Sequence, residues 1–261
     1  MSARDTAAAR TAATKTGGEA AEDVLERDAA ADVRAFYLQA AFRALLDAMA
    51  RPGELALLPQ PPERVRAEAA RIGIDAGSLV LADVLLDAAT SFAVAGPRAQ
   101  ELERAIAGRT HATVRPADQA AFLLVGTDAR GDEAARAVRA ATPGTLVSPH
   151  LGATVVVACA TLLGLDATGS RTGSASGSLA CETFALSGPG VDGTSELTLD
   201  RADVVEARIG RADEFPCGID LVLVDGAGHV AAIPRSSKVA PAGRGDADGA
   251  DAQKGGTSWA M

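Results

Sequence analysis

The segment 219–233 constrains the fold of this chain more than any other stretch, because it predicts a strand that is buried on both faces. Residues 219–224 are apolar except at Asp220, and a run without alternating polar residues is typical of a strand covered on both sides. Residues 225–228 predict a turn, and residues 229–233 return as a second strand. We therefore expect a hairpin inside a covered sheet.

The carboxylate at the start of this hairpin needs a partner, since an unpaired charge is costly in a covered strand. We place Val224 opposite His229 across the turn. In that register Asp220 and Arg235 are diagonal neighbours on one face, within reach of each other. The sequence therefore predicts an ion pair between Asp220 and Arg235. The pair either holds the strand ends together or forms part of a ligand or partner site.

Composition limits the folded part of the chain to one domain. Residues 1–30 and 240–261 are rich in small and polar residues, so they bury too little apolar surface to offset the entropy of ordering, and we expect two disordered tails. Residues 31–239 remain as a single domain. Within it, Gly and Ser are so frequent in residues 166–178 that they predict a flexible loop.

Apolar periodicity in the domain predicts helices that alternate with strands and give way to hairpins in the last third. The expected helices cover residues 33–50, 75–85, 97–106, 132–140 and a stretch ending at 209, with Asp32, Asp75 and either Asp200 or Asp203 as caps. The expected strands cover residues 54–58, 91–95, 120–125, 153–160, 179–186, 196–199, 219–224 and 229–233. This order favours an α/β fold, a three-layer αβα sandwich with a mixed sheet.

The helix 33–50 carries one apolar stripe, which we expect to face the core, and it ends at Pro52 and Gly53. Asp47 and Arg51 lie one turn apart on it, either as a solvated ion pair or as part of a site. The residues of the stripe are Leu38, Ala41, Phe42, Leu45, Leu46 and Met49.

Several function classes are excluded by composition. The net charge of −9 argues against unaided nucleic-acid binding. No apolar run is long enough to span a membrane, and the N-terminus lacks the apolar core of a secretory signal, so we expect a bacterial cytoplasmic protein. Cys159, Cys181 and Cys217 are odd in number and not clustered, which argues against disulfides and zinc. We expect Cys159 and Cys181 to be buried.

A Gly-rich loop follows the strand 179–186. Backbone amides at Ser187, Gly188 and Gly190 would suit a phosphate cradle, or the loop is a plain hairpin turn. A GxxxxGK[ST] phosphate loop and a GxSxG nucleophile motif are both absent from the sequence. We therefore predict no catalytic residue and no metal ligand, and we expect the three histidines to lie at the surface.

The chain resembles the H subunits of the bacterial carbon–phosphorus lyase core complex. The resemblance spans roughly residues 36–238 in the family's order, although Lys238 and the segment 166–178 depart from the family's pattern. It rests on Phe42–Met49 with Pro52 and Gly53, on Gly144, Thr145 and Gly152–Thr154, on Leu186–Gly190, on Phe215 and Pro216, and on Gly218–Leu221 with Ala232–Arg235.

The resemblance implies a fold similar to the large domain of pyridoxal-phosphate (PLP) transferases, without the cofactor. The sequence agrees, because no lysine that could form the Schiff base lies between Thr16 and Ser237. The resemblance also implies a function. The family's complex transfers the ribose triphosphate moiety of ATP to methylphosphonate or a similar phosphonate and releases adenine. The H subunit is required there while another subunit carries the nucleosidase chemistry, and it is a homodimer when isolated.

Three hypotheses therefore remain for this chain. It is a structural or co-catalytic subunit of that complex, bound to the other subunits. Alternatively, it is a stand-alone enzyme acting on a phosphorylated sugar or nucleotide, with the ion pair and the Gly-rich loop in one pocket, or a degenerate transferase-like fold used only for dimerisation. The candidate partner or ligand residues are Asp220, Arg235, Ser187, Gly188, Gly190, Phe215, Pro216, Asp47 and Arg51.

Overall fold

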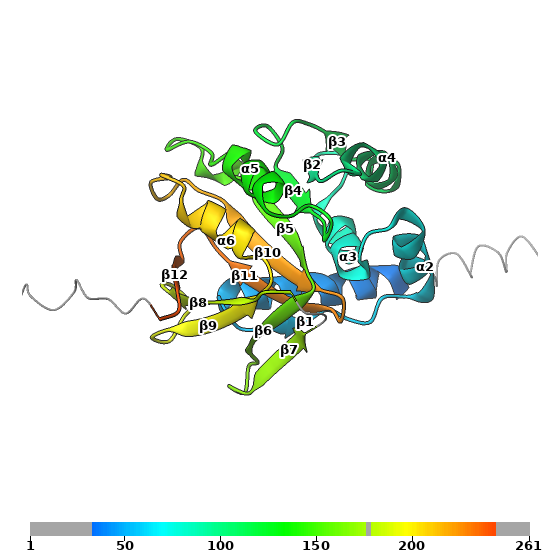
Figure 1. Ribbon diagram of the computed structural model, residues 1–261. Helices are drawn as coiled ribbons and strands as arrows, with labels where there is room; N and C mark the ends of the chain where they lie inside the picture. Colours follow the sequence, from blue (N-terminus) through cyan, green and yellow to red (C-terminus); the bar gives the residue numbers. More distant parts are fainter. Residues whose placement is uncertain (1–32, 176–178, 244–261) are drawn as a thin grey trace, which may run out of the picture.

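The computed structural model describes residues 33–175 and 179–243, and its centre is a seven-stranded mixed sheet (Figure 1). The predicted cap Asp32 and nearly all of both predicted tails lie outside the described residues. In spatial order the sheet contains β1 (Ala56–Leu57), β11 (His229–Ile233), β10 (Asp220–Asp225), β5 (Thr154–Cys159), β4 (Phe122–Val125), β2 (Ser91–Ala95) and β3 (Thr113–Val114).

The predicted hairpin lies inside this sheet, as its apolar run required. Strand β10 runs parallel to β5 on one side and antiparallel to β11 on the other, and all six of its residues are buried. Strands β5, β4, β2 and β3 continue in the same direction as β10. The mixed sheet and the buried position of the hairpin are therefore confirmed.

The predicted register of the hairpin is wrong by one residue. Val224 pairs with Val230 and not with His229. The turn is one residue longer than the assumed register allows, because Gly228 adopts a positive φ of 91° before the return strand begins. Glycine reaches this left-handed conformation without steric cost, which is why it suits such a loop. The ion pair of Asp220 with Arg235 survives the shift, since both residues lie just outside the last pair of the hairpin, Leu221 with Ile233.

Helices alone cover one face of the sheet. The helical residues 33–50, α2 (Glu63–Ile72), α3 (Ala76–Leu85) and α4 (Ala99–Thr110) pack against alternate strand residues such as Val94, Leu124, Val156 and Val222. Asp75 caps α3 as predicted, since its Oδ1 accepts a hydrogen bond from the Ser78 amide at 2.7 Å.

The opposite face is covered by two helices together with a second sheet. Helices α5 (Asp132–Ala140) and α6 (Ala202–Ile209) pack there beside an antiparallel sheet of five strands. The α/β class is confirmed, but a layer of helices alone is wrong for this face. The second sheet contains β12 (Lys238–Pro241), β8 (Glu182–Ser187), β9 (Ser195–Leu199), β6 (Thr161–Leu165) and β7 (Arg171–Ala175).

Part of the predicted flexible loop is in fact a strand. Residues 171–175 form β7, which pairs antiparallel with β6 along its whole length. Gly173 is needed there, because a Cβ atom at this position would lie 2.0 Å from the Leu162 carbonyl oxygen. The Gly and Ser content of this segment predicted a loop. In the structure, glycine instead permits β7 and β6 to approach closely. Residues 176–178 lie outside the described part of the chain.

The apolar stripe of the helix 33–50 is only partly buried. Ala41 and Leu45 are buried, but Phe42 and Leu46 are 45% and 50% exposed. Ala44 and Ala48, which the stripe omitted, are also buried, so the face toward the sheet is richer in alanine than predicted. The two larger side chains lie on the flank of the helix.

Two smaller predictions also fail. Cys159 is buried as expected, but Cys181 is exposed because it lies just before β8 begins. Helix α6 has Arg201 at its N-cap, and no side chain among the described residues caps it there. Asp200 and Asp203 have other partners, which are described below.

Candidate functional site

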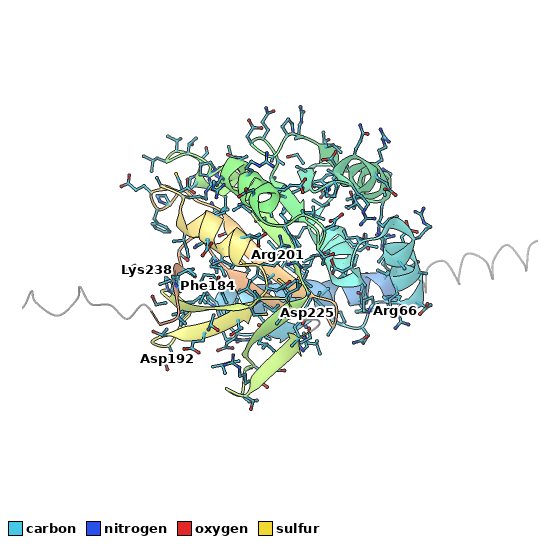
Figure 2. All side chains as sticks on the ribbon, viewed as in Figure 1. Arg66, Phe184, Asp192, Arg201, Asp225 and Lys238 are labelled. Atoms are coloured by element: carbon cyan, nitrogen blue, oxygen red, sulfur yellow. The ribbon has the colours of Figure 1, made fainter. Side chains whose placement is uncertain are left out.

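A polar cavity of about 310 Å³ lies at the amino end of β10. The chain passes it three times, at the end of α6, in the segment before β10, and in the segment between β11 and β12. Four basic residues line it, although the chain as a whole is acidic. They are Arg208, Arg211, Arg235 and Lys238, and Figure 2 shows Lys238 at the start of β12.

The predicted ion pair forms one wall of this cavity. The main-chain amide of Arg235 donates to Asp220 Oδ1 at 2.7 Å, and the Arg235 side chain donates from Nη2 to Asp220 Oδ2 at 2.5 Å. The guanidinium also donates to the carbonyl oxygens of Pro149 and Gly152. Asp220 itself is 8% exposed. The pairing is therefore confirmed, and it leaves Arg235 with little capacity for a ligand.

A second ion pair fixes another wall. Arg211 Nε donates to Asp213 Oδ2 at 2.5 Å, while its two terminal nitrogens donate to the carbonyl oxygens of Val138, Arg139 and Ala141 at the end of α5. A guanidinium satisfies the orphan carbonyls of a helix C-terminus in this way. Arg211 and Asp213 therefore join α5 to the segment before β10.

Arg208 and Lys238 differ from these two arginines. Arg208 Nη2 donates to the carbonyl oxygens of Pro234 and Ser237 at 2.7 and 3.2 Å. Its Nε is buried without a hydrogen-bond partner in the described residues, and so is the hydroxyl of Ser237. Burial lowers the pKa of Arg208, because desolvation disfavours the charged form.

The Gly-rich loop after β8 only partly reaches this site. Ser187 pairs with Lys238 across β8 and β12, and Gly188 lies against the main chain of Ser236 and Ser237. Gly190 lies instead against the carbonyl of Ala50, at the end of the helix 33–50. The loop borders the cavity at one end, and its three residues do not form a single phosphate cradle.

The remaining predicted residues lie outside the cavity. Phe215 is 68% exposed, and Pro216 does not line the cavity, although the next residue, Cys217, does. Asp47 and Arg51 approach to 3.4 Å at the end of their helix, with both side chains about half exposed. Arg51 also pairs with Glu54 at 3.0 Å. Asp47, Arg51 and Glu54 line a second cavity of about 380 Å³, so the part of this pair in a site stays a prediction.

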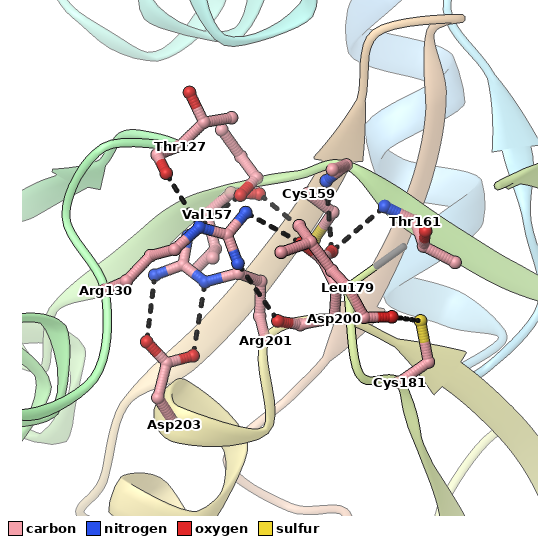
Figure 3. Close-up of polar contacts among 12 residues, drawn as sticks. Thr127, Arg130, Val157, Cys159, Thr161, Leu179, Cys181, Asp200, Arg201 and Asp203 are labelled. Carbon is pink, nitrogen blue, oxygen red and sulfur yellow. Dashed lines mark hydrogen bonds and ion pairs between the residues drawn. The ribbon is translucent and has the colours of Figure 1, made fainter. Parts of the chain in front are cut away.

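Sequence reasoning missed a buried network at the opposite ends of the parallel strands, around Arg201 (Figure 3). The Arg201 side chain is fully buried and donates to the carbonyl oxygens of Gly126, Ala158 and Ala129 and to Asp203. Beside it, Asp200 Oδ1 accepts from the amides of Ala160 and Thr161, and its Oδ2 accepts from Arg130 at 2.7 Å. The network joins the two sheets and α6. Its only sequence signal is the run of charges before that helix.

A second buried polar cluster lies in the hairpin turn. Asp225 is fully buried, and its Oδ2 lies 2.8 Å from Nδ1 of His229 and 2.5 Å from the hydroxyl of Ser174. Its Oδ1 accepts from the amides of Ala227 and His229 at 2.9 Å. His229 is therefore less exposed than predicted. Neither Asp225 nor His229 lines the cavity at the amino end of β10.

The described residues contain no group of three or more His, Cys, Asp or Glu side chains placed to hold a metal ion. Within the same ranges, every helix is too short or too polar to cross a membrane.

A comparison with curated protein sequences finds no match. A comparison with protein families does find one, since the family described as bacterial phosphonate metabolism protein (PhnH) matches residues 30–240, most of the chain. The match includes the hairpin, the cavity and both buried networks, so the chain belongs to the PhnH family of bacterial phosphonate metabolism proteins.

Proposed function

We propose that this chain is the H subunit of a carbon–phosphorus lyase core complex in a bacterial cytoplasm. In that role it is required for transfer of the ribose triphosphate moiety of ATP to methylphosphonate or a similar phosphonate, with release of adenine. The family match over residues 30–240 is the observation that carries the proposal. The proposal includes the other subunits as partners and a homodimer for the isolated chain.

The chemistry of the described residues supports a structural or co-catalytic subunit more than an autonomous enzyme. Among the described residues, His229 is the one histidine paired with a carboxylate, and that carboxylate is fully buried in a hairpin turn. Arg211 and Arg235 are held by internal partners at the cavity. Lys238 is the only lysine in the described ranges and is exposed on the outer strand β12. We propose a fold similar to the large domain of PLP transferases that carries no PLP, since a Schiff-base lysine would be held inside the protein.

The helix 33–50 offers a surface for sister subunits. Phe42 and Leu46 lie one turn apart on its exposed flank. Large apolar side chains that share an exposed face favour a contact with another protein. The edge strand β1 also exposes Leu57 (57%). These residues support docking of a sister subunit at this surface.

Co-purification tests the proposal. The tagged chain should capture the other lyase subunits when they are expressed together, and a Phe42→Gln/Leu46→Gln variant should lose that capture without losing stability. Val114→Gln is the matched control, because Val114 is 41% exposed on β3 at the far edge of the sheet. If the wild-type chain captures none of the subunits, the proposal is wrong.

The cavity favours one alternative function, a stand-alone enzyme acting on a phosphorylated sugar or nucleotide. Arg235 lines the cavity, and the Gly-rich loop borders it at Ser187 and Gly188. Turnover of ATP with methylphosphonate by the purified chain alone would support this alternative. A third function, dimerisation alone, predicts that size-exclusion elution is unchanged when the other subunits are added.

A further inference from the structure

We propose that the cavity between α6 and β12 binds a tetrahedral dianion, a phosphonate or phosphate group, through Arg208, Lys238 and Ser237. The choice of a phosphonate as the first ligand to test rests on the proposed function. The binding site itself is inferred from the charges and the unpaired donors that the cavity brings together.

The balance of charge at the cavity selects an anion of charge −2. Arg235 is neutralised by Asp220 at 2.5 Å, and Arg211 is neutralised by Asp213 at 2.5 Å. Arg208 and Lys238 have no ion pair among the residues described. The cavity therefore carries two uncompensated positive charges. A dianion would neutralise both, whereas a monoanion would neutralise one.

The hydrogen-bond donors at the cavity point to the same ligand. Ser237 is 6% exposed, and its hydroxyl has no hydrogen-bond partner within the described ranges. Arg208 Nε is likewise buried and unpaired there. Buried donors of this kind are uncommon in folded proteins, because each one has lost its hydrogen bonds to water. Both residues line the cavity, so a small rotation of each side chain on binding would bring its donor to an oxygen of a phosphonate or phosphate.

Hydrogen bonds to main-chain carbonyl oxygens fix the side chain of Arg208 at the cavity. Its Nη2 donates to the carbonyl oxygens of Pro234 and Ser237, which fixes the guanidinium against the segment that leads to Lys238. A charge-assisted hydrogen bond from a guanidinium fixed in this way to an oxyanion is stronger than a bond between neutral groups. The volume of about 310 Å³ lies at the lower end of the range for small-molecule pockets, ~300–1,000 Å³. The cavity thus has the size expected for a small organic phosphonate or phosphate ester.

Titration of the purified full-length chain tests the inference. Methylphosphonate, inorganic phosphate and methanesulfonate are each added at mildly alkaline pH, and binding is followed by calorimetry. We expect both phosphorus dianions to bind, and methanesulfonate, which has a similar shape but one charge, to bind about tenfold more weakly or worse. Tighter binding of methylphosphonate identifies a phosphonate site, and tighter binding of phosphate identifies a site for phosphate esters. Equal binding of methanesulfonate and methylphosphonate would overturn the inference.

Substitutions locate the site within the molecule. Arg208→Gln and Lys238→Gln should each weaken methylphosphonate binding about tenfold or more, while the control Arg104→Gln on the exposed face of α4 should keep it. Lys238→Gln removes an exposed side chain from an outer strand, so it tests the site even if Arg208→Gln does not fold. Wild-type affinity in Lys238→Gln would disprove the assignment.

This experiment separates the inference from the proposed function. Capture of the lyase subunits and binding of methylphosphonate are measured independently on the same protein. Binding without capture would refute the subunit role and leave the dianion site intact. Capture without any anion binding would refute the site and leave the subunit role intact.

Discussion

Arg235 binds the carboxylate of Asp220 with its main chain and its side chain at the same time. The amide of Arg235 reaches Oδ1 at 2.7 Å, Nε lies 3.1 Å from Oδ2, and Nη2 reaches Oδ2 at 2.5 Å. Because the amide belongs to the residues just after β11, the pair fixes both the side chain and the path of the chain where the hairpin ends.

The first prediction concerns this pair. Asp220→Ala should lower the free energy of unfolding by about 1–3 kcal/mol, since it leaves a part-buried guanidinium without its carboxylate. Urea denaturation measures the loss. In a double-mutant cycle with Arg235→Ala, the two losses should not add, because each variant already breaks the same interaction. Strictly additive losses would show that the pair contributes no coupling.

The Asp220–Arg235 pair shows how far sequence reasoning reaches in this fold. Local chemistry was sufficient to find it, because a carboxylate in an apolar strand requires a cation nearby. Helix α5 and strand β2 were also predicted with their observed bounds. Their signals, apolar periodicity and the residues that end an element, are likewise local. The hairpin register was missed because it depends on the backbone angle at Gly228.

Other features could not be predicted because they depend on distant residues. Strand β7 is rich in Gly and Ser, and only its partner β6 makes it a strand. The cavity forms where three separate segments meet, so no local motif marks Arg208 or Ser237. Arg201 is similar in this respect, because the carbonyls that bury it lie more than 40 residues away.

The second prediction concerns Arg201. Arg201→Met should lower the free energy of unfolding by about 3–5 kcal/mol, because Asp203 and the three carbonyl oxygens lose a fully buried partner. Arg66→Met is the matched control. Arg66 makes an exposed ion pair with Glu63, as Figure 2 shows at the surface of α2, and its loss should change stability by about 1 kcal/mol or less. Equal effects of the two substitutions would contradict the structural role of Arg201.

The third prediction concerns Asp75, the cap of α3. Burial raises its pKa, since Oδ2 is buried without a hydrogen-bond partner among the described atoms. A raised folded-state pKa means that stability falls as pH rises through the unfolded pKa and stays lower above the folded one. Asp75→Asn keeps the cap without the charge, so it should be more stable than the wild type at neutral pH.

Acidification provides the check on this prediction. The advantage of Asp75→Asn should shrink as pH falls through the raised pKa, because the wild-type carboxyl then becomes neutral as well. Asp75→Ala removes the cap and should be about 1 kcal/mol less stable than Asp75→Asn. Thermal unfolding across the acid range measures both differences. A difference between Asp75→Asn and the wild type that does not change with pH would show that the carboxyl is not desolvated.

The last prediction concerns Tyr37, the only tyrosine of the chain. Burial, and then the charge of Asp83, raises the pKa of Tyr37 to about 12. The neutral phenol is therefore favoured in the folded state, and stability should fall as pH rises from the unfolded value of about 10 toward 12. Ultraviolet absorbance reads this ionisation directly, because no other tyrosine contributes. Most of the phenol should stay neutral at about pH 11 while circular dichroism shows a folded chain, whereas the chain in urea should titrate near 10. A midpoint near 10 in the folded protein would show that water reaches the phenol, and that the helix 33–50 does not pack beside Asp83 as described.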